Sequence, residues 1–350
     1  MCKIKKIEIN NFRGICSLQI DDLRRVNVIL GNNNCGKSSL LEAVLIMMGA
    51  DKPSLPIEMN FNRNYMGLEK DDFSSFFHDM DTESPIKFHA SYTDGKSRQV
   101  IIRYNEEKIN EVDASRIQES GNAVGSLQKY GLEFECIDGC EETKSSVYYN
   151  TAENKMNFSA AKPTSPRIPT FFMCARYNFN EYIMHFNQIV TDKEKPAVIE
   201  ALQTIEPKIS DVVVVGDNVK VDVQLQKLIP INLMGDGTRK LFTVATALYN
   251  AKNGILIIDE VDNGLYHKSM KALWNLIITT ATKLNAQVLV STHSIDSLRA
   301  LNSLLTDKLP DSRDDVKIYT LRKNVEDNVT CYPYEYDKFS YLLDMEEEIR

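Results

Sequence analysis

The chain has 350 residues, of which 43% are hydrophobic and 26% are charged, a composition typical of globular proteins. Its net charge of −8 excludes a global basic field that would draw the whole protein onto nucleic acid or an anionic membrane. The seven cysteines form only one close pair, Cys136 and Cys140, which predicts reduced thiols and no zinc site. The start of the chain has no apolar leader segment and no run is long enough to span a bilayer, so we expect a soluble, cytoplasmic protein.

The first half of the chain is predicted to be mainly β-structure. Apolar and alternating runs indicate strands over residues 4–12, 17–20 and 25–30, and a helix over residues 37–49. Residues 51–84 are polar and are predicted to be rich in loops. Further strands are expected over residues 84–92, 98–104, 131–137 and 145–150, the first two joined as a hairpin around Asp94-Gly95.

The second half alternates short apolar strands with helices. Pro163, Pro166 and Pro169 mark the boundary between the halves. Beyond it we expect strands over residues 170–178, 254–260 and 287–294, a hairpin over 211–225, and helices over 179–206, 239–251 and 266–283. This alternation predicts an α/β fold whose central sheet is covered by helices on both faces.

A glycine-rich loop separates the strand at 25–30 from the helix at 37–49. Its sequence, Gly31-x-x-x-x-Gly36-Lys37-Ser38, is the full pattern of a phosphate-binding loop. The glycines let backbone N–H groups surround a phosphate, Lys37 adds a positive charge, and Ser38 offers a hydroxyl to Mg²⁺. The positive end of the helix dipole favours the same anion. The loop therefore predicts a nucleotide site; Cys35 is interpreted as a small loop residue, with a redox-sensitive thiol as the alternative.

Two acidic residues end the apolar strand "ILIIDE". Asp259 is expected to orient Mg²⁺, and Glu260 to polarise the attacking water. His293, in "STHS" after the next apolar strand, could contact the γ-phosphate and sense its loss. Because neighbouring parallel strands end at one edge of a sheet, we expect the loop, the acids and the histidine to meet there.

The segment "MGDGTRKLF" places two glycines at the start of a helix, where free N–H groups and a positive dipole end are presented. By itself the segment is interpreted as a tight turn at a helix start. The alternative is a second anion site that closes on the nucleotide of another subunit.

These motifs together resemble the ABC-type ATPases of the RecF, SMC and OLD (overcoming lysogenization defect) group. The similar stretches are "IEINNFRGI", "VNVILGNNNCGKSSLLEA", "GDGTRK", "IIDEVDNGLYH", "STHS" and the ending "YDKFSYLLDMEEEIR". The resemblance implies a P-loop NTPase with an ABC-ATPase head, a mixed or parallel central sheet covered by helices, a β-rich insertion and a helical signature lobe. It implies one domain over residues 1–350, with a Walker A lobe at about 1–50 and 251–330, the insertion at about 51–168 and the signature lobe at about 169–250.

The resemblance also implies ATP and Mg²⁺ as ligands and assigns roles to individual residues. Lys37, Glu260 and His293 would be catalytic, and Ser38 and Asp259 would hold Mg²⁺. The nucleotide would be bound in one copy by Asn11, Phe12, Arg13, Gly14, Gly31, Asn32, Asn33, Asn34, Cys35, Gly36, Lys37, Ser38 and Ser39. The second copy would contribute Gly235, Asp236, Gly237 and Thr238, with the D-loop residues Asn263 and Gly264.

The sequence also departs from the group's pattern. The group's Q-loop glutamine has no clear counterpart, since Gln99 and Gln118 lie in unsuitable contexts; residues 76–81 could take its place, with His78 or Asp79 at the position. There is no long heptad segment and no CxxC hook, so long coiled-coil arms are not expected. Only 57 residues follow His293, so no Toprim nuclease domain is expected within this chain.

The resulting functional hypothesis is an ATPase that forms a homodimer around ATP and regulates a separately encoded effector, such as a nuclease or toxin, in bacterial defence against phage. A RecF-like ATPase that binds DNA or DNA ends is the alternative, and a switch that barely hydrolyses ATP is a third. The basic residues Lys3, Lys5, Lys6, Arg24 and Arg25 are interpreted as a solvated face, with a nucleic-acid patch as the alternative.

Overall fold

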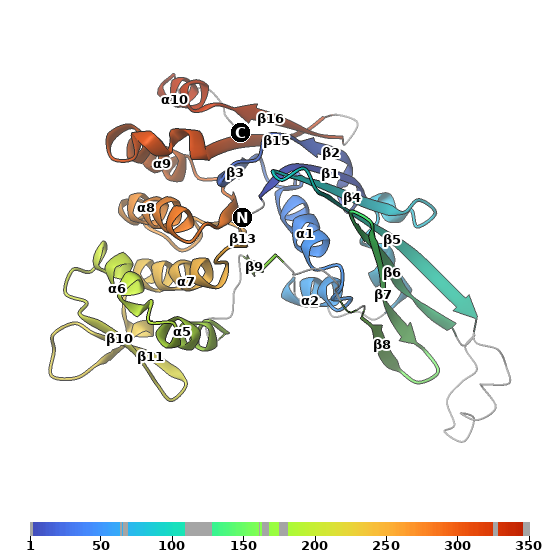
Figure 1. Cartoon of the computed structure of the whole chain (residues 1–350), viewed down its shortest axis with the longest axis horizontal. Helices are drawn as coiled ribbons and strands as arrows, with labels where there is room; N and C mark the ends of the chain where they lie inside the picture. Colours follow the sequence, from blue (N-terminus) through green and yellow to red (C-terminus); the bar gives the residue numbers. More distant parts are fainter. Residues whose placement is uncertain are drawn as a thin grey trace.

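The computed structural model describes residues 3–63, 65, 69–108, 128–160, 162, 168–174, 181–324 and 328–345. Two large sheets lie on either side of one helix, α1 (Lys37–Met48), as Figure 1 shows. Helices cover the outer face of the first sheet, so the order through the molecule is helices, sheet, α1 and second sheet (Figure 1). Within the described ranges, no helix is long and apolar enough to cross a membrane.

The first sheet has six strands in the order β16-β15-β3-β14-β13-β9. Five of them run parallel to their neighbours: β9 (Thr170–Met173), β13 (Ile255–Ile258), β14 (Gln287–Ser291), β3 (Val26–Leu30) and β15 (Val316–Lys323). The edge strand β16 (Val329–Tyr334) is antiparallel to β15. The carboxyl ends of the parallel strands therefore share one edge, where α/β folds place their ligands.

Both faces of this sheet are buried, which explains its continuously apolar strands. In β13, Leu256 and Ile258 face one core and Ile255 and Ile257 face the other. The first core lies under α7 (Asp236–Asn250), α8 (His267–Lys283) and α9 (Ile295–Asp307); the second surrounds α1. The prediction of an α/β fold with helices on both faces is thus confirmed.

The second sheet is antiparallel, with seven strands in the order β2-β1-β4-β5-β6-β7-β8. These are β1 (Ile4–Phe12), β2 (Ile15–Ile20), β4 (Ile86–Tyr92), β5 (Ser97–Lys108), β6 (Gln128–Asp138), β7 (Glu141–Asn150) and β8 (Lys155–Ser159). The strands from residues 51–168 thus extend the N-terminal hairpin. Arg98 on β5 pairs with Asp138 at 2.6 Å and donates to the carbonyl oxygen of Met48 at 3.1 Å, so it fastens this sheet to the end of α1.

A smaller lobe packs on α7. It contains α5 (Glu181–Thr191), α6 (Lys195–Gln203), η3 (Ile231–Leu233) and a three-stranded sheet of β10 (Asp211–Val215), β11 (Asn218–Asp222) and β12 (Ile229–Pro230). The single helix expected over 179–206 is therefore two helices. Lys193, with φ 62°, and Pro196 in the first turn of α6 explain the break, because neither suits a helix interior.

Residues 51–84 correct the prediction of loops, because they contain α2 (Leu55–Asn62), α3 (Lys70–Ser74) and the 3₁₀ turn η1 (His78–Met80). Pro56 lies in the first turn of α2, where its missing N–H costs nothing. A capping box between Glu69 and Asp72 starts α3. Among the described side chains, Met59 and Phe73 are the large apolar ones that α2 and α3 fully bury, so no apolar periodicity marks these short helices in the sequence.

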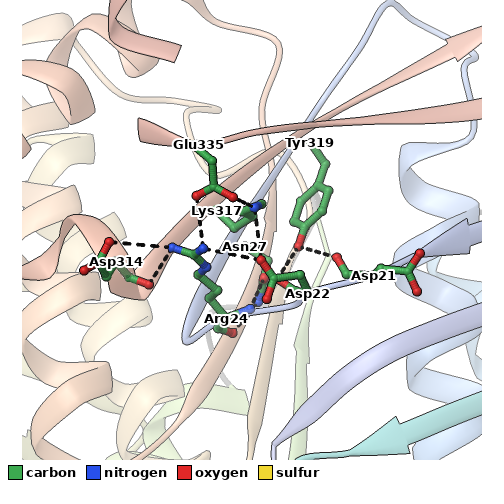
Figure 2. A network of polar contacts seen from close by, with 8 residues as sticks. All are labelled: Asp21, Asp22, Arg24, Asn27, Asp314, Lys317, Tyr319 and Glu335. Carbon is green, nitrogen blue, oxygen red and sulfur yellow. Dashed lines mark hydrogen bonds and ion pairs between the residues drawn. The ribbon is translucent and has the colours of Figure 1, made fainter. Parts of the chain in front are cut away.

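The last part of the chain closes the first sheet with η4 (Pro310–Asp315), β15, β16 and α10 (Tyr336–Asp344). Lys317 on β15 is buried and donates to Asp22, at 3.1 Å, and to Glu335. Figure 2 shows the network that ties the segment before β3 to β15 and the start of α10, formed by Asp21, Asp22, Arg24, Asn27, Asp314, Lys317, Tyr319 and Glu335. This network lies at the amino ends of β3 and β15, away from the edge where their carboxyl ends meet.

Candidate functional site

The loop between β3 and α1 depends on glycine at two positions. Gly31 has φ 142° and Gly36 has φ 96°, values that residues with a side chain rarely adopt. A Cβ atom at Gly31 would lie 2.5 Å from Cys35 Sγ and 2.5 Å from the carbonyl oxygen of Leu321 on β15. At Gly31 the loop is packed tightly against Cys35 and β15, so a ligand can approach only from the opposite side of the loop, where the cavity lies.

That open side carries the start of α1. Leu40 N donates to Gly36 O at 2.8 Å, so the amides of residues 37–39 precede the first hydrogen bond of the helix. Such amides, together with the helix dipole, favour a bound anion. Gly36, Lys37, Ser38 and Ser39 all line the adjacent cavity, so this arrangement fits the phosphates of a nucleotide.

Lys37 and Cys35 are both buried within the loop. Lys37 Nζ donates to the carbonyl oxygens of Gly31 and Asn32, at 2.8 Å each, and lies 4.0 Å from Cys35 Sγ. Burial raises the pKa of the Cys35 thiol, although the charge of Lys37 opposes this shift. The thiol is therefore protonated at neutral pH and unreactive, which argues against a redox role.

A cavity of about 570 Å³ lies in front of the loop, at the carboxyl edge of the first sheet. It brings together the phosphate-binding loop and the two acids that follow β13, as predicted, whereas His293, which was expected to meet them, is not part of its lining. Its lining also includes residues that the sequence did not single out, from the ends of α2, α3 and β15. The lining consists of Arg13, Gly14, Asn33, Asn34, Gly36, Lys37, Ser38, Ser39, Arg63, Ser75, Phe77, Asp79, Met80, Asp259, Glu260 and Lys323.

Asp259 and Glu260 are held by the neighbouring strand. Ser291, the last residue of β14, donates its hydroxyl hydrogen to Asp259 Oδ1 at 2.6 Å. The Ser291 hydroxyl oxygen in turn accepts a hydrogen bond from Glu260 N at 2.8 Å. Glu260 has φ 52°, the left-handed region, which is unusual for a residue with a side chain and costs on the order of 1–3 kcal/mol. The surrounding contacts maintain this strained turn at the cavity wall.

Two arginines on one carboxylate form the wall beside the loop. Glu42 on α1 is buried, and its oxygens lie 2.9 Å from Arg13 Nε and 2.8 Å from Arg63 Nε. Arg13 also lies over the ring of Phe76, at 4.9 Å. Burial lowers the pKa of Arg13 to about 10, against the opposing charge of Glu42, so Arg13 remains charged at neutral pH. Arg63 was not predicted, since it comes from a segment that was expected to be a loop.

Other predicted residues lie outside this cavity. The side chain of Asn11 donates to the carbonyl oxygen of Ser84 at 2.6 Å, and Phe12 is fully buried against Phe88. These two residues shape the turn that presents Arg13 rather than lining the cavity themselves. Gly31, Asn32 and Cys35 form the back of the phosphate-binding loop and are likewise absent from the cavity wall.

The residues of the expected second half-site do not line the cavity either. Gly235, Asp236, Gly237 and Thr238 are at the start of α7, and Asn263 follows the acids in an exposed turn. A Cβ atom at Gly235 would meet nothing within 4 Å, so this backbone is open to an approaching molecule. His293 is exposed directly after β14 and precedes Ser294, whose hydroxyl accepts from Ser297 N at 3.2 Å and caps α9.

The segment expected to replace the Q-loop glutamine borders the cavity. Phe77, Asp79 and Met80 line it, and the Asp79 side chain is largely exposed. His78 is turned aside, with its Nδ1 atom 2.8 Å from the carbonyl oxygen of Arg13. Gln99 pairs with His89 and Ile137 within the second sheet, and Gln118 lies outside the described residues.

The basic residues near the N-terminus are largely paired with acids. Lys6 lies 2.7 Å from Glu8, and Arg25 lies 3.2 Å from Asp315. Arg24 contacts Asp22, Asp314 and Glu335. The positive charge of Lys6, Arg24 and Arg25 is therefore compensated, which favours the interpretation as a solvated face over a nucleic-acid patch.

The sequence is similar to two described families. Residues 2–162 match the family described as "AAA ATPase domain". Residues 175–299 match the family described as "AAA domain, putative AbiEii toxin, Type IV TA system". The two matches lie one after the other, and each contains one of the predicted motif groups: the phosphate-binding loop in the first, and the signature segment, the acids and the histidine in the second.

Relatives and solved structures agree with these matches. The chain is 23% identical to an "ATP/GTP phosphatase" of Helicobacter pylori, over 99% of both chains. Over 49 residues it is 47% identical to an uncharacterized protein of Methanocaldococcus jannaschii, a stretch that covers 14% of this chain and 22% of that protein.

The fold is that of solved SMC heads. One is the "SmcHead bound to the C-winged helix domain of ScpA", with a TM-score of 0.51 and 13% identity over 96% of this chain and 99% of the other. Another is a Smc head with an extended coiled coil bound to the C-terminal domain of ScpA derived from Pyrococcus furiosus, with a TM-score of 0.50 and 11% identity over 99% of both chains. The chain is therefore similar to AAA-type ATPase domains over both of its halves, has the fold of SMC heads, and is an enzyme that hydrolyses ATP.

Proposed function

We propose that two copies of this chain close around ATP, each copy completing the site of the other. One observation carries this proposal: the cavity gathers Lys37, Ser38, Asp259 and Glu260, whereas the signature segment at Gly235 lies outside it with its backbone open. The cavity of one copy therefore contains the residues that would bind the phosphates, but not the signature segment that begins at Gly235. A second copy, related by two-fold symmetry, would supply the missing half to each site.

Within one copy, the residues at the cavity have separate tasks. Lys37 and the amides of residues 37–39 would bind the phosphates, and Ser38 and Asp259 would hold Mg²⁺, which would supply positive charge to screen the phosphates. Glu260, aimed by its left-handed turn, accepts a proton from the attacking water. His293 and the signature segment of the partner copy would stabilise the γ-phosphate during hydrolysis.

The side chains present fit a metal–nucleotide complex. In the described part of the chain, Asp259 Oδ1 is occupied by the Ser291 hydroxyl while Oδ2 accepts no hydrogen bond. A carboxylate oxygen, a serine hydroxyl and phosphate oxygens are the oxygen ligands that Mg²⁺ prefers. Lys37 is already directed along the loop by two carbonyl oxygens, so phosphates can replace part of its contacts without moving the backbone.

We further propose that the dimer regulates a separately encoded effector, such as a nuclease or toxin, in defence against phage. The family description of residues 175–299 names a toxin system, which supports this role. The paired state of Arg24, Arg25 and Lys6 weighs against the alternative of a DNA-binding ATPase.

Dimer formation can be tested with Glu260→Gln, which should bind ATP and hydrolyse it about 10²–10⁴-fold more slowly. With ATP and Mg²⁺ it should elute as a dimer on sizing, whereas Lys37→Ala should remain a monomer. A Glu260→Gln variant that stays monomeric at saturating ATP would contradict the ATP-dependent dimer.

The shared site can be tested at Gly235, where added atoms meet nothing in the same copy. Gly235→Val should keep the melting temperature of the wild type yet lose hydrolysis, because its side chain would collide with the partner's nucleotide. Mixing it with Lys37→Ala should restore part of the activity, since a mixed dimer holds one intact site. No recovery on mixing would argue that each copy works alone.

The biological role can be tested by plating phage on bacteria that express this chain together with the product of the gene next to it in its genome. Protection should require both proteins and be lost with Glu260→Gln. ATPase activity stimulated by DNA, and weakened steeply by salt, would instead favour the RecF-like alternative.

A further inference from the structure

The acids of the site converge on one buried serine. Ser291 is fully buried at the end of β14, beside the end of β13 in the parallel pair. Its hydroxyl oxygen accepts from Glu260 N at 2.8 Å and is 2.6 Å from Asp259 Oδ1, and its carbonyl oxygen accepts from Val261 N at 3.0 Å. A single residue on β14 thus holds three consecutive residues that follow β13.

The direction of these hydrogen bonds follows from the chemistry of the groups. The backbone N–H of Glu260 can only donate, so the Ser291 oxygen must accept from it. A serine hydroxyl has one hydrogen to give, and a carboxylate is the better acceptor, so that hydrogen goes to Asp259. The hydroxyl therefore fixes the rotation of the Asp259 carboxylate and leaves Oδ2 for a cation.

The same hydroxyl also holds Glu260, through the hydrogen bond that it accepts from the backbone N–H of that residue. Glu260 holds φ 52° only because its surroundings fix it. These contacts are the bond from Glu260 N to Ser291 and the bond from Asn263 N to Glu260 O at 3.1 Å. Loss of the serine hydroxyl would leave a buried N–H without a partner and release the turn that aims the Glu260 carboxylate.

We propose that Ser291 is a positioning residue for both acids, acting on the Mg²⁺ ligand through Asp259 and on the general base through the backbone of Glu260. This rests on the proposed roles of those two acids. Supporting groups of this kind typically change metal affinity or activity about 10–100-fold when removed. The serine was not singled out in the sequence because its partners lie 31 and 32 residues away, on the neighbouring strand.

The test compares Ser291→Ala with Ser297→Ala, a matched control. Ser297 is equally buried, but its hydroxyl accepts from Trp274 Nε1 at 3.1 Å, within the core under α8 and α9. Binding of a fluorescent ATP analogue is measured across a Mg²⁺ titration and in EDTA, alongside kcat. For Ser291→Ala, the Mg²⁺ concentration that gives half of the increase in affinity for the ATP analogue should rise about tenfold, and kcat should fall 10–100-fold. The affinity for the analogue in EDTA should stay unchanged. Ser297→Ala should lower only the melting temperature.

Ser291→Thr keeps the hydroxyl and should recover the Mg²⁺ dependence. If Ser291→Ala does not fold, Ser291→Cys, with a weaker donor, replaces it in the same titration. A Mg²⁺ dependence and kcat within twofold of wild type in the hydroxyl-free variant would overturn the positioning role. If Asp259→Asn also leaves the Mg²⁺ dependence unchanged, the fault lies with the proposed role of Asp259.

Discussion

The ammonium group of Lys37 donates a 2.8 Å hydrogen bond to the carbonyl oxygen of Gly31, six residues earlier in the same loop. A second bond of 2.8 Å goes to the carbonyl oxygen of Asn32. The lysine is therefore stretched across the loop before any phosphate arrives, and its charge lies at the wall of the cavity. Little side-chain freedom remains to be lost when a nucleotide binds, which favours tight binding.

Lys37→Met should abolish this charge while keeping a side chain of similar length. Hydrogen bonds to charged groups contribute about 1.5–3 kcal/mol each. We therefore expect ATP affinity to fall by roughly 10–150-fold or more. The free energy of unfolding should fall as well, because the hydrogen bonds from Lys37 to the carbonyl oxygens of Gly31 and Asn32 are also lost. Lys252→Met, at an exposed position, is the control. Isothermal titration with ATP and Mg²⁺ checks this, and unaltered affinity would show that Lys37 does not contact the phosphates.

Gly31→Ala should destabilise the loop itself. The added Cβ would lie 2.5 Å from two atoms, and one of these, the carbonyl oxygen of Leu321, belongs to the backbone of β15. Relief requires β15 or the loop to move, so we expect a loss of about 1–3 kcal/mol in the free energy of unfolding, together with weaker ATP binding.

The control for that substitution is Gly95→Ala. Gly95 also has a positive φ, 83°, but a Cβ atom there would meet nothing within 4 Å. Gly95→Ala should therefore lower the free energy of unfolding only by the cost of backbone strain, about 1 kcal/mol, and should bind ATP normally. Equal losses by urea denaturation in the two variants would mean that the contact with β15 is not the cause.

The sequence was sufficient to place the phosphate-binding loop, the two acids and the parallel strands, because these depend on local chemistry and on continuous apolar runs. It did not reveal Arg63 or Ser291 as parts of the site, since each acts through a partner far along the chain, Glu42 in one case and Asp259 in the other. The helices around Met59 and Phe73 were missed because one fully buried large apolar side chain per helix leaves no periodic apolar pattern.

The cysteines should differ sharply in reactivity. Cys16 and Cys140 are exposed, whereas Cys35 is buried with a raised pKa. Under native conditions, iodoacetamide should modify Cys16 and Cys140 before Cys35, and their modification should leave ATPase activity unchanged. Mass spectrometry of peptides after timed alkylation checks the order. Early modification of Cys35 with parallel loss of activity would restore the redox interpretation.

A buried lysine on α7 should make stability depend on pH. Lys240 on α7 is almost fully buried, and burial lowers its pKa from 10.5 to about 8, although Asp262 and Glu260 pull in the opposite direction. Between pH 8 and 10.5 the unfolded chain holds a proton that the folded chain has released, so stability from this group rises with pH across that window. The full rise would be roughly 3 kcal/mol, from about 1.4 kcal/mol for each pKa unit of the shift.

Urea denaturation of the wild type and Lys240→Met at pH 7.5 and pH 9.5 isolates this contribution. The cysteines and tyrosines also titrate near the upper limit, but they do so equally in both proteins, so only the difference between them is used. We expect the wild type to gain stability relative to Lys240→Met as the pH rises. Lys252→Met, which removes an exposed lysine, should follow the wild type. Parallel pH profiles for the wild type and Lys240→Met would show that Lys240 keeps an ordinary pKa in the folded protein.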